Sequence, residues 1–493
     1  ISPLLILDYA NQNYDQGHTP HSPNAIAAFG RYCGAVVSQF PEIREVEIWN
    51  EYNGAFCDGP ATSDRARYYS DLLKSSYGAI KAQRPTVTVV GADTVGVPLP
   101  YLKKLITHGA FDAMDAISVH PYRYEEAPEG IETDIHDLRA LLQQSHHELP
   151  IWVTEIGWYL KAAKAAGDLA IDEGTQAKFL VRAYGLLLSE HVARIYWYDL
   201  KDNPSEPPLG LLDEKGRPRM AARAYATLIQ KLHGFDFIER EKSVSSFYSL
   251  VFRSATGATL RLVWSTQVQE IHVDPSASVI GILGEPLAQH GVVSISDTPV
   301  YIENSAKLSG VPPPEIVFAD SRRDFSDAPD AHGWKYGYMD QGTFKTLTRY
   351  AEDDWNGAWL IAGATQGNYA HLAVTAHSQN PSAAQHHPIP VVRRWVSDHA
   401  GRVHISAKFA CPASIGDGVT VTILGAGRIL YQLHHLGGKQ PTALSGQFEC
   451  DLNVNPGTFI DFVVGPGISG NFDYDDTAIY IRITDTAAAA ITP

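Results

Sequence analysis

The chain has 493 residues, more than one compact core usually holds, and its 44% hydrophobic and 19% charged residues are typical of a soluble multidomain protein. Its formal net charge is −16 and it lacks a run rich in Lys and Arg, which argues against nucleic acid or anionic membranes as partners, because both require clustered positive charge. No apolar stretch approaches the roughly 18 residues of a membrane span, so no membrane insertion is expected.

The first part of the chain alternates strand-like and helical segments. Short apolar runs rich in β-branched residues predict strands at residues 4–8, 46–50, 86–91, 116–120, 151–155 and 194–198. Helical patterns lie between and after them, at residues 23–39, 63–83, 100–108, 132–145, 174–189 and 220–232. Repeated βα units of this length indicate an all-parallel sheet that is buried on both faces.

Six βα units are visible, whereas a closed (β/α)8 TIM barrel needs eight. The sheet could be open and doubly wound, or it could belong to a barrel whose first two βα units are absent from this chain. Long loops after the strands, together with the glutamates that end the second and fifth strands, favour the barrel. We therefore expect a missing N-terminal segment or a second polypeptide to complete it.

The pattern changes from about residue 234. Short alternating runs at residues 247–252, 259–264, 268–273 and 291–295 predict an antiparallel β-sandwich, and the stretch Val311-Pro312-Pro313-Pro314 reads as a stiff linker. Further strand-like runs beyond it, without helices between them, predict a C-terminal β-sandwich or jelly roll. The predicted domains are residues 1–233, 234–308 and 309–493.

Two glutamates close strand-like runs, Glu51 in Trp49-Asn50-Glu51 and Glu155 in Thr154-Glu155-Ile156-Gly157. Barrels place their chemistry at the carboxyl ends of their strands, which meet at one face. Two carboxyls at one mouth suit glycoside cleavage, in which one protonates the leaving oxygen and the other attacks the anomeric carbon. We assign Glu51 as the acid/base and Glu155 as the nucleophile. Strand-end charges paired with Lys or Arg are the alternative.

Further polar and aromatic residues lie at the expected mouth. Asn50 could bond the sugar 2-hydroxyl, a contact that strengthens in the transition state. His120 or Tyr122 could orient the nucleophile or line the site, unless His120-Pro121 is only a structural turn. The remaining candidates are Trp158 and Trp197 as sugar platforms or core residues, Asp199 and Asp202 as hydroxyl contacts or loop caps, and Asn11 as a subsite residue at the mouth.

Residues 1–302 resemble the clan A glycoside hydrolases, and most of all family 39, with its bacterial exopolysaccharide glycosidases and β-xylosidases. The resemblance implies a (β/α)8 barrel with an adjoining β-sandwich, Glu51 as acid/base, Glu155 as nucleophile and net retention of configuration. The chain differs from the family in lacking the segment for strands one and two, and in having Tyr52 where proline is common. The matching segments are Leu4-Leu5-Ile6-Leu7-Asp8-Tyr9-Ala10-Asn11 (like the third barrel strand), Trp49-Asn50-Glu51, His120-Pro121-Tyr122, Thr154-Glu155-Ile156-Gly157-Trp158 and Trp197-Tyr198-Asp199.

The last domain resembles the carbohydrate-binding β-sandwich modules of bacterial glycosidases, although a structural module that binds no sugar is equally compatible. Cys411 and Cys450 could form a disulfide or remain separate thiols. No CxxC or His-x-x-His spacing indicates a transition-metal site. The suggestive features are Arg393-Arg394-Trp395, Gly416-Asp417-Gly418-Val419 and Ile460-Asp461-Phe462, and a loop with Asp473, Asp475 and Asp476 that could hold calcium but is better explained as a solvated acidic turn.

The sequence thus predicts a secreted or periplasmic retaining glycoside hydrolase that acts on a poly- or oligosaccharide and needs no cofactor. A catalytically silent carbohydrate-binding or adhesin-like protein is the rival from another class, and the presence of both Glu51 and Glu155 weighs against it. A transglycosylase would use the same residues and differ in how well its acceptor site excludes water. The opening Ile1-Ser2-Pro3 shows no signal peptide, which is compatible with a true N-terminus upstream.

Overall fold

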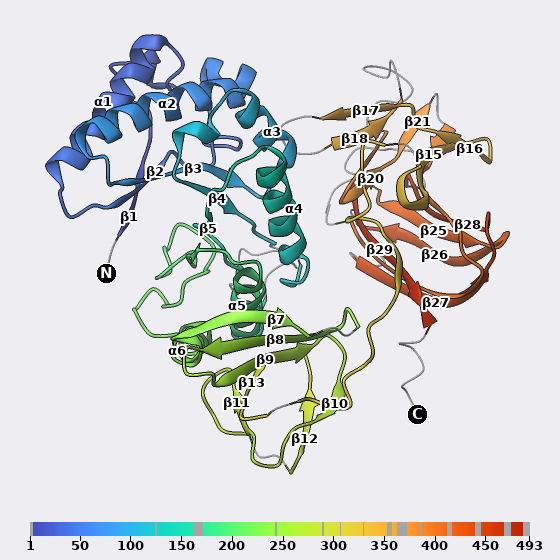
Figure 1. The fold of residues 1–493 in the computed structure, drawn as a ribbon. Coiled ribbons are helices and arrows are strands. Elements are labelled where there is room, and N and C mark those ends of the chain that lie inside the picture. The colour runs from blue at the N-terminus through green and yellow to red at the C-terminus, as the bar shows by residue number, and fades with distance from the viewer. Residues whose placement is uncertain are drawn as a thin grey trace. The chain divides into compact units, whose positions relative to one another are not determined.

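The chain forms two compact units, Ile1–Pro312 and Pro313–Pro493, in the computed structural model (Figure 1). The polyproline stretch predicted as a linker contains the division between them. The structure describes residues 3–123, 126–160, 171–241, 244–287, 290–305, 307–328, 330–352, 357–361, 372–384, 387–411, 417–438, 445–467 and 475–486.

The first unit is built around a six-stranded parallel sheet in the order β1-β2-β3-β4-β5-β6. A doubly wound sheet reverses its strand order at a switch point, whereas a barrel keeps its strands in chain order. The sequential order therefore favours a TIM-like domain over the doubly wound alternative. The strands are β1 (Leu4–Leu7), β2 (Glu45–Ile48), β3 (Thr88–Val95), β4 (Ala116–His120), β5 (Ile151–Val153) and β6 (Arg194–Ile195).

Six α-helices accompany these strands close to where the sequence predicts them. Ser22 begins the first helix by accepting a hydrogen bond from the Ala25 backbone amide, and Pro23 occupies its first turn. Asp64 and Asp172 cap two other helices in the same way. The helices are α1 (Pro23–Gln39), α2 (Arg65–Gln83), α3 (Leu99–Thr107), α4 (Ile131–Gln144), α5 (Glu173–Ser189) and α6 (Met220–Leu232), and short 3₁₀ turns lie at Asp15–Gly17, Gly59–Asp64, Phe111–Ala113 and Ala331–Gly333.

An antiparallel sheet in the order β11-β13-β9-β8-β7 follows the last helix, and β10 pairs with β12 beside it. Its inner face and the helices share one continuous hydrophobic core. A Cβ atom on Gly185 of α5, for example, would lie 2.7 Å from Leu262, which shows how closely helix and sheet approach. These strands are β7 (Phe235–Arg240), β8 (Phe247–Ser254), β9 (Thr259–Ser265), β10 (Gln269–His272), β11 (Ser278–Gly281), β12 (Val292–Ile295) and β13 (Val300–Glu303).

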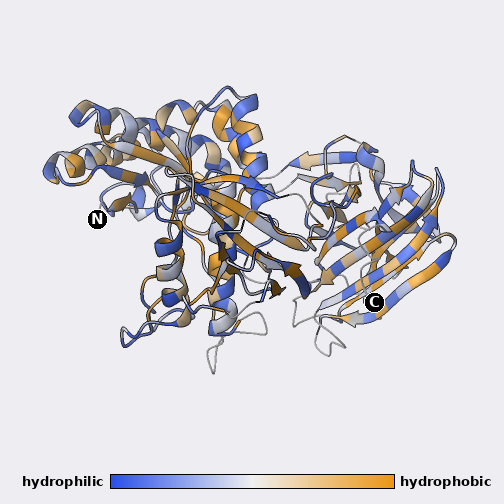
Figure 2. Cartoon of the chain, turned by 60° about the horizontal axis from the view of Figure 1, so that its bottom comes forward, coloured by the Kyte–Doolittle hydropathy of each residue, from blue (hydrophilic) through white to orange (hydrophobic). Residues whose placement is uncertain are grey.

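The second unit consists of two larger antiparallel sheets and a two-stranded one, β21-β22. One larger sheet has the order β17-β18-β19-β20-β29-β24-β27, with β14 also paired to β29, and the other has the order β16-β15-β23-β28-β25-β26. Alternating hydrophobic and hydrophilic bands along these strands (Figure 2) agree with burial of one face of each sheet in a common core. The strands are β14 (Val317–Asp320), β15 (Trp334–Asp340), β16 (Thr343–Thr346), β17 (Arg349–Glu352), β18 (Gly357–Leu360), β19 (Ala373–Thr375), β20 (Ser378–Asn380), β21 (Ser382–Ala384), β22 (His387–Ile389), β23 (Val391–Val396), β24 (Gly401–Ala410), β25 (Val419–Gly425), β26 (Arg428–Leu436), β27 (Ser445–Val454), β28 (Phe459–Gly465) and β29 (Thr477–Asp485).

The suggestive residues of the second unit have mainly structural surroundings. Arg393 and Trp395 are buried, and the Arg393 guanidinium donates to the backbone carbonyl of Ser321. Arg394 makes a bidentate ion pair with Asp461. Both Cys411 and Cys450 are free thiols. Of the two proposed motifs in loops, Asp475 and Asp476 are described, whereas Asp473 and Gly416 lie outside the described residues.

Among the helices that the structure describes, none combines the length and the apolar character needed to cross a membrane.

Candidate active site

The segment after β2 turns sharply to present Glu51. Trp49 and Glu51 have positive backbone φ angles of 74° and 45°, an uncommon conformation for residues with a side chain. The Trp49 backbone amide donates to the carbonyl of Leu7, so the turn continues the pairing of β2 with β1. The Trp49 ring is buried, while the Glu51 side chain keeps 16% of its surface exposed. The carboxyl of Glu51 is therefore held at the carboxyl end of the sheet.

His120 ends β4 and links the two predicted catalytic glutamates. Its Nδ1 lies 2.9 Å from Oε1 of Glu51 and 3.9 Å from Oε2 of Glu155. Its Nε2 lies 2.7 Å from Oδ1 of Asp93 and 3.1 Å from Oγ1 of Thr154. The imidazole thus has a carboxyl on both sides, with the catalytic pair on one side and a buried carboxyl on the other.

Glu155 follows β5 and is held from two directions. The Tyr122 hydroxyl donates to Oε2 of Glu155 at 2.8 Å. Two residues later, Gly157 passes so close to β6 that a Cβ atom there would lie 2.2 Å from the carbonyl oxygen of Tyr198. Only glycine permits this approach of the two strand ends. This close contact therefore explains why a glycine follows two positions after Glu155.

The structure brings the two predicted catalytic carboxyls together. One carboxyl oxygen of Glu51, one of Glu155 and a ring nitrogen of His120 all lie within 4.8 Å of one another. Carboxyl pairs at about 5–5.5 Å leave no room for a water between them, whereas pairs at about 6.5–9.5 Å do. The pair is thus close enough for one carboxyl to attack the atom whose leaving group the other protonates.

Two more acidic residues lie directly behind His120. Glu47 and Asp93 are fully buried, and together with His120 they form a second cluster whose polar atoms lie within 4.8 Å of one another. Oγ1 of Thr154 donates to Oε1 of Glu47 at 3.0 Å and joins this cluster to β5. Asp93 occupies a β-bulge in β3 with φ of 44°, which turns its side chain toward His120.

This concentration of carboxyls changes their acid–base properties. Burial raises the pKa of Glu47 to about 8, and the nearby Asp93 charge adds to the increase. Burial raises the pKa of Asp93 too, although the positive charge of His120 opposes it. For His120 itself, burial alone would lower the pKa, but Asp93, Glu51 and Glu155 outweigh it and raise the pKa well above its usual value. His120 is consequently an imidazolium at neutral pH, and both ring nitrogens donate.

The pKa of Glu155 is raised by burial, and the His120 charge and the Tyr122 hydrogen bond work against that increase. Both opposing contacts favour the carboxylate. The nearby tyrosine Tyr198 has a pKa raised to about 12 by burial and by the Glu206 carboxyl. The phenol of Tyr198 therefore stays protonated at neutral pH and can act as a neutral hydrogen-bonding group near the nucleophile.

The other candidate residues divide into those at the site and those that hold loops. Trp158 is fully buried and its indole donates to the carbonyls of Arg123 and Glu126, so the packing alternative applies to it rather than a sugar platform. Trp197 packs against Trp158 with ring centroids 6.0 Å apart and remains partly exposed. Asp202 is buried in an ion pair with Arg219 instead of facing a hydroxyl.

Three polar candidates keep distinct surroundings. Asn11 is exposed and its side-chain oxygen accepts from the Asn13 amide, so it shapes its own turn. Oδ1 of Asn50 and Oδ1 of Asp199 are buried and have no hydrogen-bond partner among the described residues. A buried polar atom without a partner usually needs one, and a bound sugar hydroxyl could supply it. Asn50 therefore remains a suitable contact for the 2-hydroxyl.

Sequence reasoning missed Asp93, Glu47 and the linking role of Thr154. Glu47 left a signal, because it interrupts a strand expected to be buried on both faces, where an unpaired charge is costly. Asp93 gave a weaker signal in the sequence, because the predicted third strand ends at residue 91, two positions before it. The bulge that carries Asp93 extends β3 to Val95, and a bulge of this kind has no reliable sequence signature.

The two His120 clusters also contain the ligand types that a cation can use. In both of them the ring nitrogens of His120 already face carboxyl oxygens at hydrogen-bond distance. A metal would require His120 to be neutral and to give up one of these contacts. Oε2 of Glu47 and Oδ2 of Asp93 are buried without a hydrogen-bond partner among the described residues, whereas the two ring nitrogens of His120 are occupied. The contacts of His120 fit direct acid–base chemistry.

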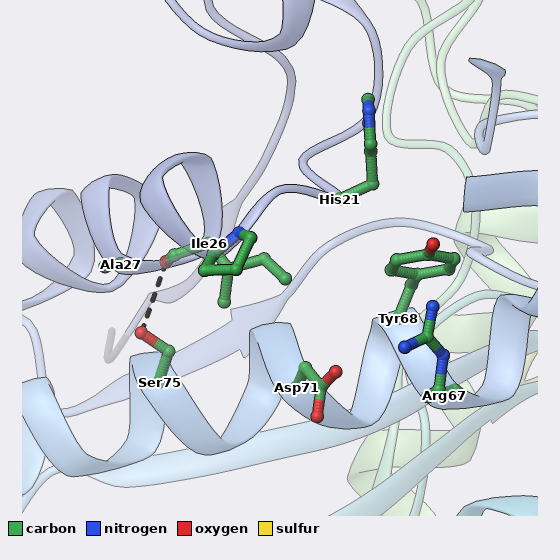
Figure 3. A pocket seen from close by; sticks show the side chains of 8 residues that line it. His21, Ile26, Ala27, Arg67, Tyr68, Asp71 and Ser75 are labelled. Atoms are coloured by element: carbon green, nitrogen blue, oxygen red, sulfur yellow. Dashed lines mark hydrogen bonds between the residues drawn. The ribbon is translucent and has the colours of Figure 1, made fainter. Parts of the chain in front are cut away.

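Two hollows of about 540 Å³ each lie away from the glutamates. The first lies between α1 and α2, where His21, Tyr68 and Arg67 surround it (Figure 3). The second is bordered by the loop after β6, including Asp202 and Arg219. Neither contains Glu51 or Glu155, so we place the chemistry at the open end of the parallel sheet.

Comparisons with known proteins agree with this site. Residues 38–225 match the family model described as the glycosyl hydrolase catalytic core, a segment that includes both glutamates. Among solved structures, a family 39 glycoside hydrolase from the gut symbiont Bacteroides cellulosilyticus WH2 aligns with a TM-score of 0.53 and 22% identity, covering 62% of this chain and 68% of that chain. No curated protein matches the chain.

Two further structures are more distant. A family 39 beta-xylosidase from Caulobacter crescentus has a TM-score of 0.43 and 18% identity, covering 62% of this chain and 79% of that chain. The family 39 enzyme from Xanthomonas axonopodis pv. citri has a TM-score of 0.38 and 14% identity, covering 92% of this chain and 76% of that chain. Residues 38–225 are thus similar to a glycosyl hydrolase catalytic core. The chain resembles the clan A glycoside hydrolases, and among them most of all family 39.

Proposed function

We propose that this protein is a retaining glycoside hydrolase that cleaves an oligo- or polysaccharide by double displacement, with Glu51 as acid/base and Glu155 as nucleophile. The observation that carries the proposal is the close approach of the Glu51 and Glu155 carboxyls, within 4.8 Å. At that spacing, direct attack by a carboxylate is favoured over attack by an interposed water. No cofactor takes part in this mechanism.

In the first step, Glu155 attacks the anomeric carbon and forms a covalent glycosyl–enzyme ester. Glu51 transfers its proton to the leaving oxygen as the glycosidic bond breaks. Nδ1–H of His120 donates to Oε1 of Glu51, which leaves Oε2 as the oxygen that holds and delivers the proton. In the second step, Glu51 as a carboxylate accepts a proton from water, and that water attacks the same carbon from the opposite side and releases Glu155.

The surrounding residues prepare the two carboxyls for these roles. Tyr122 donates to Glu155 and favours its carboxylate, which is the form that attacks. Asp93 and Thr154 face the far nitrogen of His120 and fix the ring in the orientation that reaches Glu51. We expect the Asn50 side-chain oxygen, which has no partner among the described residues, to accept a hydrogen bond from the 2-hydroxyl of the sugar at the scissile bond.

The substrate class is a carbohydrate with β-linked sugars among the first candidates. Two similar structures are a family 39 glycoside hydrolase and a beta-xylosidase, and 62% of this chain aligns with the first. Sugar binding by the C-terminal unit and a location outside the cytoplasm, secreted or periplasmic, belong to the same proposal. Fractionation of the native host and sugar-array binding by the whole chain would check these two points.

Turnover of 4-nitrophenyl glycosides tests the proposed function. A panel of β-xyloside, β-glucoside, β-galactoside and α-L-arabinoside should contain at least one substrate. Glu155→Gln should abolish measurable turnover of it, and Glu51→Gln should reduce kcat by a factor of about 10²–10⁴, because general acid–base catalysis contributes about that much. Glu42→Gln, at an exposed glutamate outside the site, is the matched control and should keep wild-type activity.

Two results would contradict the proposal. Full activity of either site variant would remove the assigned role. Sugar binding without any turnover would favour the carbohydrate-binding protein instead. A transglycosylase would be recognised by transfer products when a sugar acceptor is added, at the expense of free sugar.

A further inference from the structure

Two aromatic rings are exposed in the loops that follow β1 and β2. Tyr9 follows β1 and Phe56 lies in the loop after β2, and they are 50% and 44% exposed. Their ring centroids are 6.0 Å apart and their planes differ by 26°, so together they present one apolar surface. A single exposed ring needs no explanation, but adjacent large rings at the mouth of a site are typical of a binding surface.

This pair is connected to the acid/base through neighbouring residues. The Tyr9 ring meets Trp49 edge to face at 6.0 Å, and Trp49 stands two positions before Glu51. Burial raises the pKa of Tyr9, the Asp8 charge adds to the increase, and Asn50 opposes it. Tyr9 therefore lies near Asn50, the residue that we expect to contact the sugar 2-hydroxyl. A sugar unit on the two rings would adjoin the one at the scissile bond.

The loop that carries Phe56 is held rigidly. The Trp49 indole donates to the Phe56 carbonyl at 3.0 Å. Asn53, which is fully buried, donates to the Val95 carbonyl and accepts from the Val95 amide. These bonds fix the loop to β3. The Phe56 ring is thus exposed because its backbone is held in that position, and not because the loop is loosely packed.

The two loops are also tied to each other. The backbone amide and the hydroxyl of Thr19, in the loop after β1, donate to Oδ1 of Asp58 at 2.7 and 2.9 Å. In return the Asp58 amide donates to the Thr19 hydroxyl at 2.9 Å. Three hydrogen bonds therefore hold the loops of Tyr9 and Phe56 together. A binding surface that is already in place loses little entropy when a ligand binds.

The charges near the rings favour an uncharged ligand. Asp8 adjoins Tyr9, and Asp58 lies two residues after Phe56. Of the groups there that can be cationic, His18 already pairs with Asp58 at 3.0 Å, and Arg65, whose charge acts on Cys57, is only partly exposed. A uronic acid on the rings would face the carboxyls of Asp8 and Asp58. A neutral pyranose can place its C–H face on the rings and donate hydroxyls to Asp8.

We propose that Tyr9 and Phe56 form a platform for an uncharged sugar residue of the substrate chain, next to the sugar at the scissile bond, with Asp8 accepting a hydroxyl hydrogen bond from it. This inference rests on the proposed glycosidase function. It makes the protein an enzyme whose preference for chains over single glycosides is set at this platform.

Phe56→Ala tests the platform most cleanly, because the aromatic contact of this ring is with Tyr9 rather than with the catalytic glutamates. The measurement compares kcat/KM for xylohexaose and cellohexaose with kcat/KM for 4-nitrophenyl β-xyloside and β-glucoside. The ratio of chain to aryl glycoside should fall about tenfold, equivalent to about 1.4 kcal/mol of lost binding. Tyr9→Leu should lower the ratio similarly, whereas Tyr9→Phe should retain most of it. Phe40→Ala, at a ring that is 45% exposed at the end of α1, is the matched control.

The outcomes separate the platform from the enzyme function. An unchanged ratio in Phe56→Ala and Tyr9→Leu, with both variants folded by circular dichroism, would overturn the platform and leave the hydrolase intact. An equal fall in kcat/KM for chains and for aryl glycosides, together with a lower Tm, would show that the rings only pack against the fold. That result would also overturn the platform. Tight binding of hexagalacturonic acid at the rings would refute the charge preference. Absence of turnover on every substrate would overturn the proposed function itself.

Discussion

The Tyr122–Glu155 hydrogen bond gives the sharpest test of how the nucleophile is prepared. Tyr122→Phe removes only the hydroxyl that donates to Oε2 of Glu155 at 2.8 Å. A hydrogen bond to a charged group contributes about 1.5–3 kcal/mol, which corresponds to about one to two pKa units at 1.36 kcal/mol per unit. Glu155 keeps 19% of its side chain exposed, so water can replace part of this bond, and a shift of about one unit is expected.

The direction of the expected pKa shift follows from the role of Glu155 as the nucleophile. The hydrogen bond favours the carboxylate, so its loss raises the pKa of Glu155 above its already raised value. Attack requires the carboxylate, so kcat/KM falls as pH drops through that pKa. The acid limb of the pH profile should therefore move upward by about one unit in Tyr122→Phe, while the alkaline limb stays in place.

The assay is kcat/KM for the best 4-nitrophenyl glycoside, measured from pH 4 to pH 9. Tyr431→Phe removes a hydroxyl from a half-buried tyrosine of β26 in the second unit and serves as the matched control. An acid limb that stays in place, or moves to lower pH, would refute the reasoning. It would mean that Tyr122 does not stabilise the attacking carboxylate.

Other substitutions test the network behind the site. Asp93→Asn should lower the pKa of His120, because burial then acts without its opposing carboxylate, and NMR titration of the imidazole should show it becoming neutral at lower pH than in the wild type. Glu47→Gln should raise Tm relative to the wild type near pH 9 and change it little at pH 5, since the raised pKa of Glu47 makes its contribution to stability fade as pH rises through about 8. Gly157→Ala should destabilise the fold by about 1–3 kcal/mol in urea unfolding, because its new methyl group would meet the Tyr198 carbonyl. A wild-type His120 titration in Asp93→Asn, a pH-independent Tm difference for Glu47→Gln, or an unaltered unfolding midpoint for Gly157→Ala would contradict these expectations.

The barrel-like part of the fold was largely accessible from the sequence. Its helices have strong periodicity and clear caps such as Ser22-Pro23, and their predicted ranges agree with the structure to within two residues. The strand runs located Glu51 and Glu155 at carboxyl ends because parallel strands share one direction. The order of the strands could not be read from the pattern alone, since open and barrel sheets use the same βα unit.

The β-rich regions were harder to predict. Several strands, such as β16 and β20, are only three or four residues long and contain polar residues, so they carry little alternation. Their stability comes from pairing with partners far along the chain, which a local pattern does not record. The division of the first unit at residue 233 stays a prediction, although its helices and its antiparallel sheet share one core.

Within the site, the sequence predicted which residues lie near the two glutamates, but not whether their side chains are buried or exposed. His120 and Tyr122 lie where the motif suggested, because both follow directly from the end of β4. Trp158 looked equally suitable as a platform, yet its ring turns inward and donates to two backbone carbonyls. The exposed rings of Tyr9 and Phe56 were not anticipated, because their exposure depends on how two loops are tied together through Thr19 and Asp58.

Trapping the covalent intermediate tests the central claim most directly. A 2,4-dinitrophenyl 2-deoxy-2-fluoroglycoside of the preferred sugar should inactivate the protein, because fluorine slows the release of the ester more than its formation. Mass spectrometry of the digested protein should then find one fluoroglycosyl group on the peptide that contains Glu155, and none in Glu155→Gln. A label on Glu51 or another residue, or release of product with inverted configuration and no adduct, would contradict the mechanism.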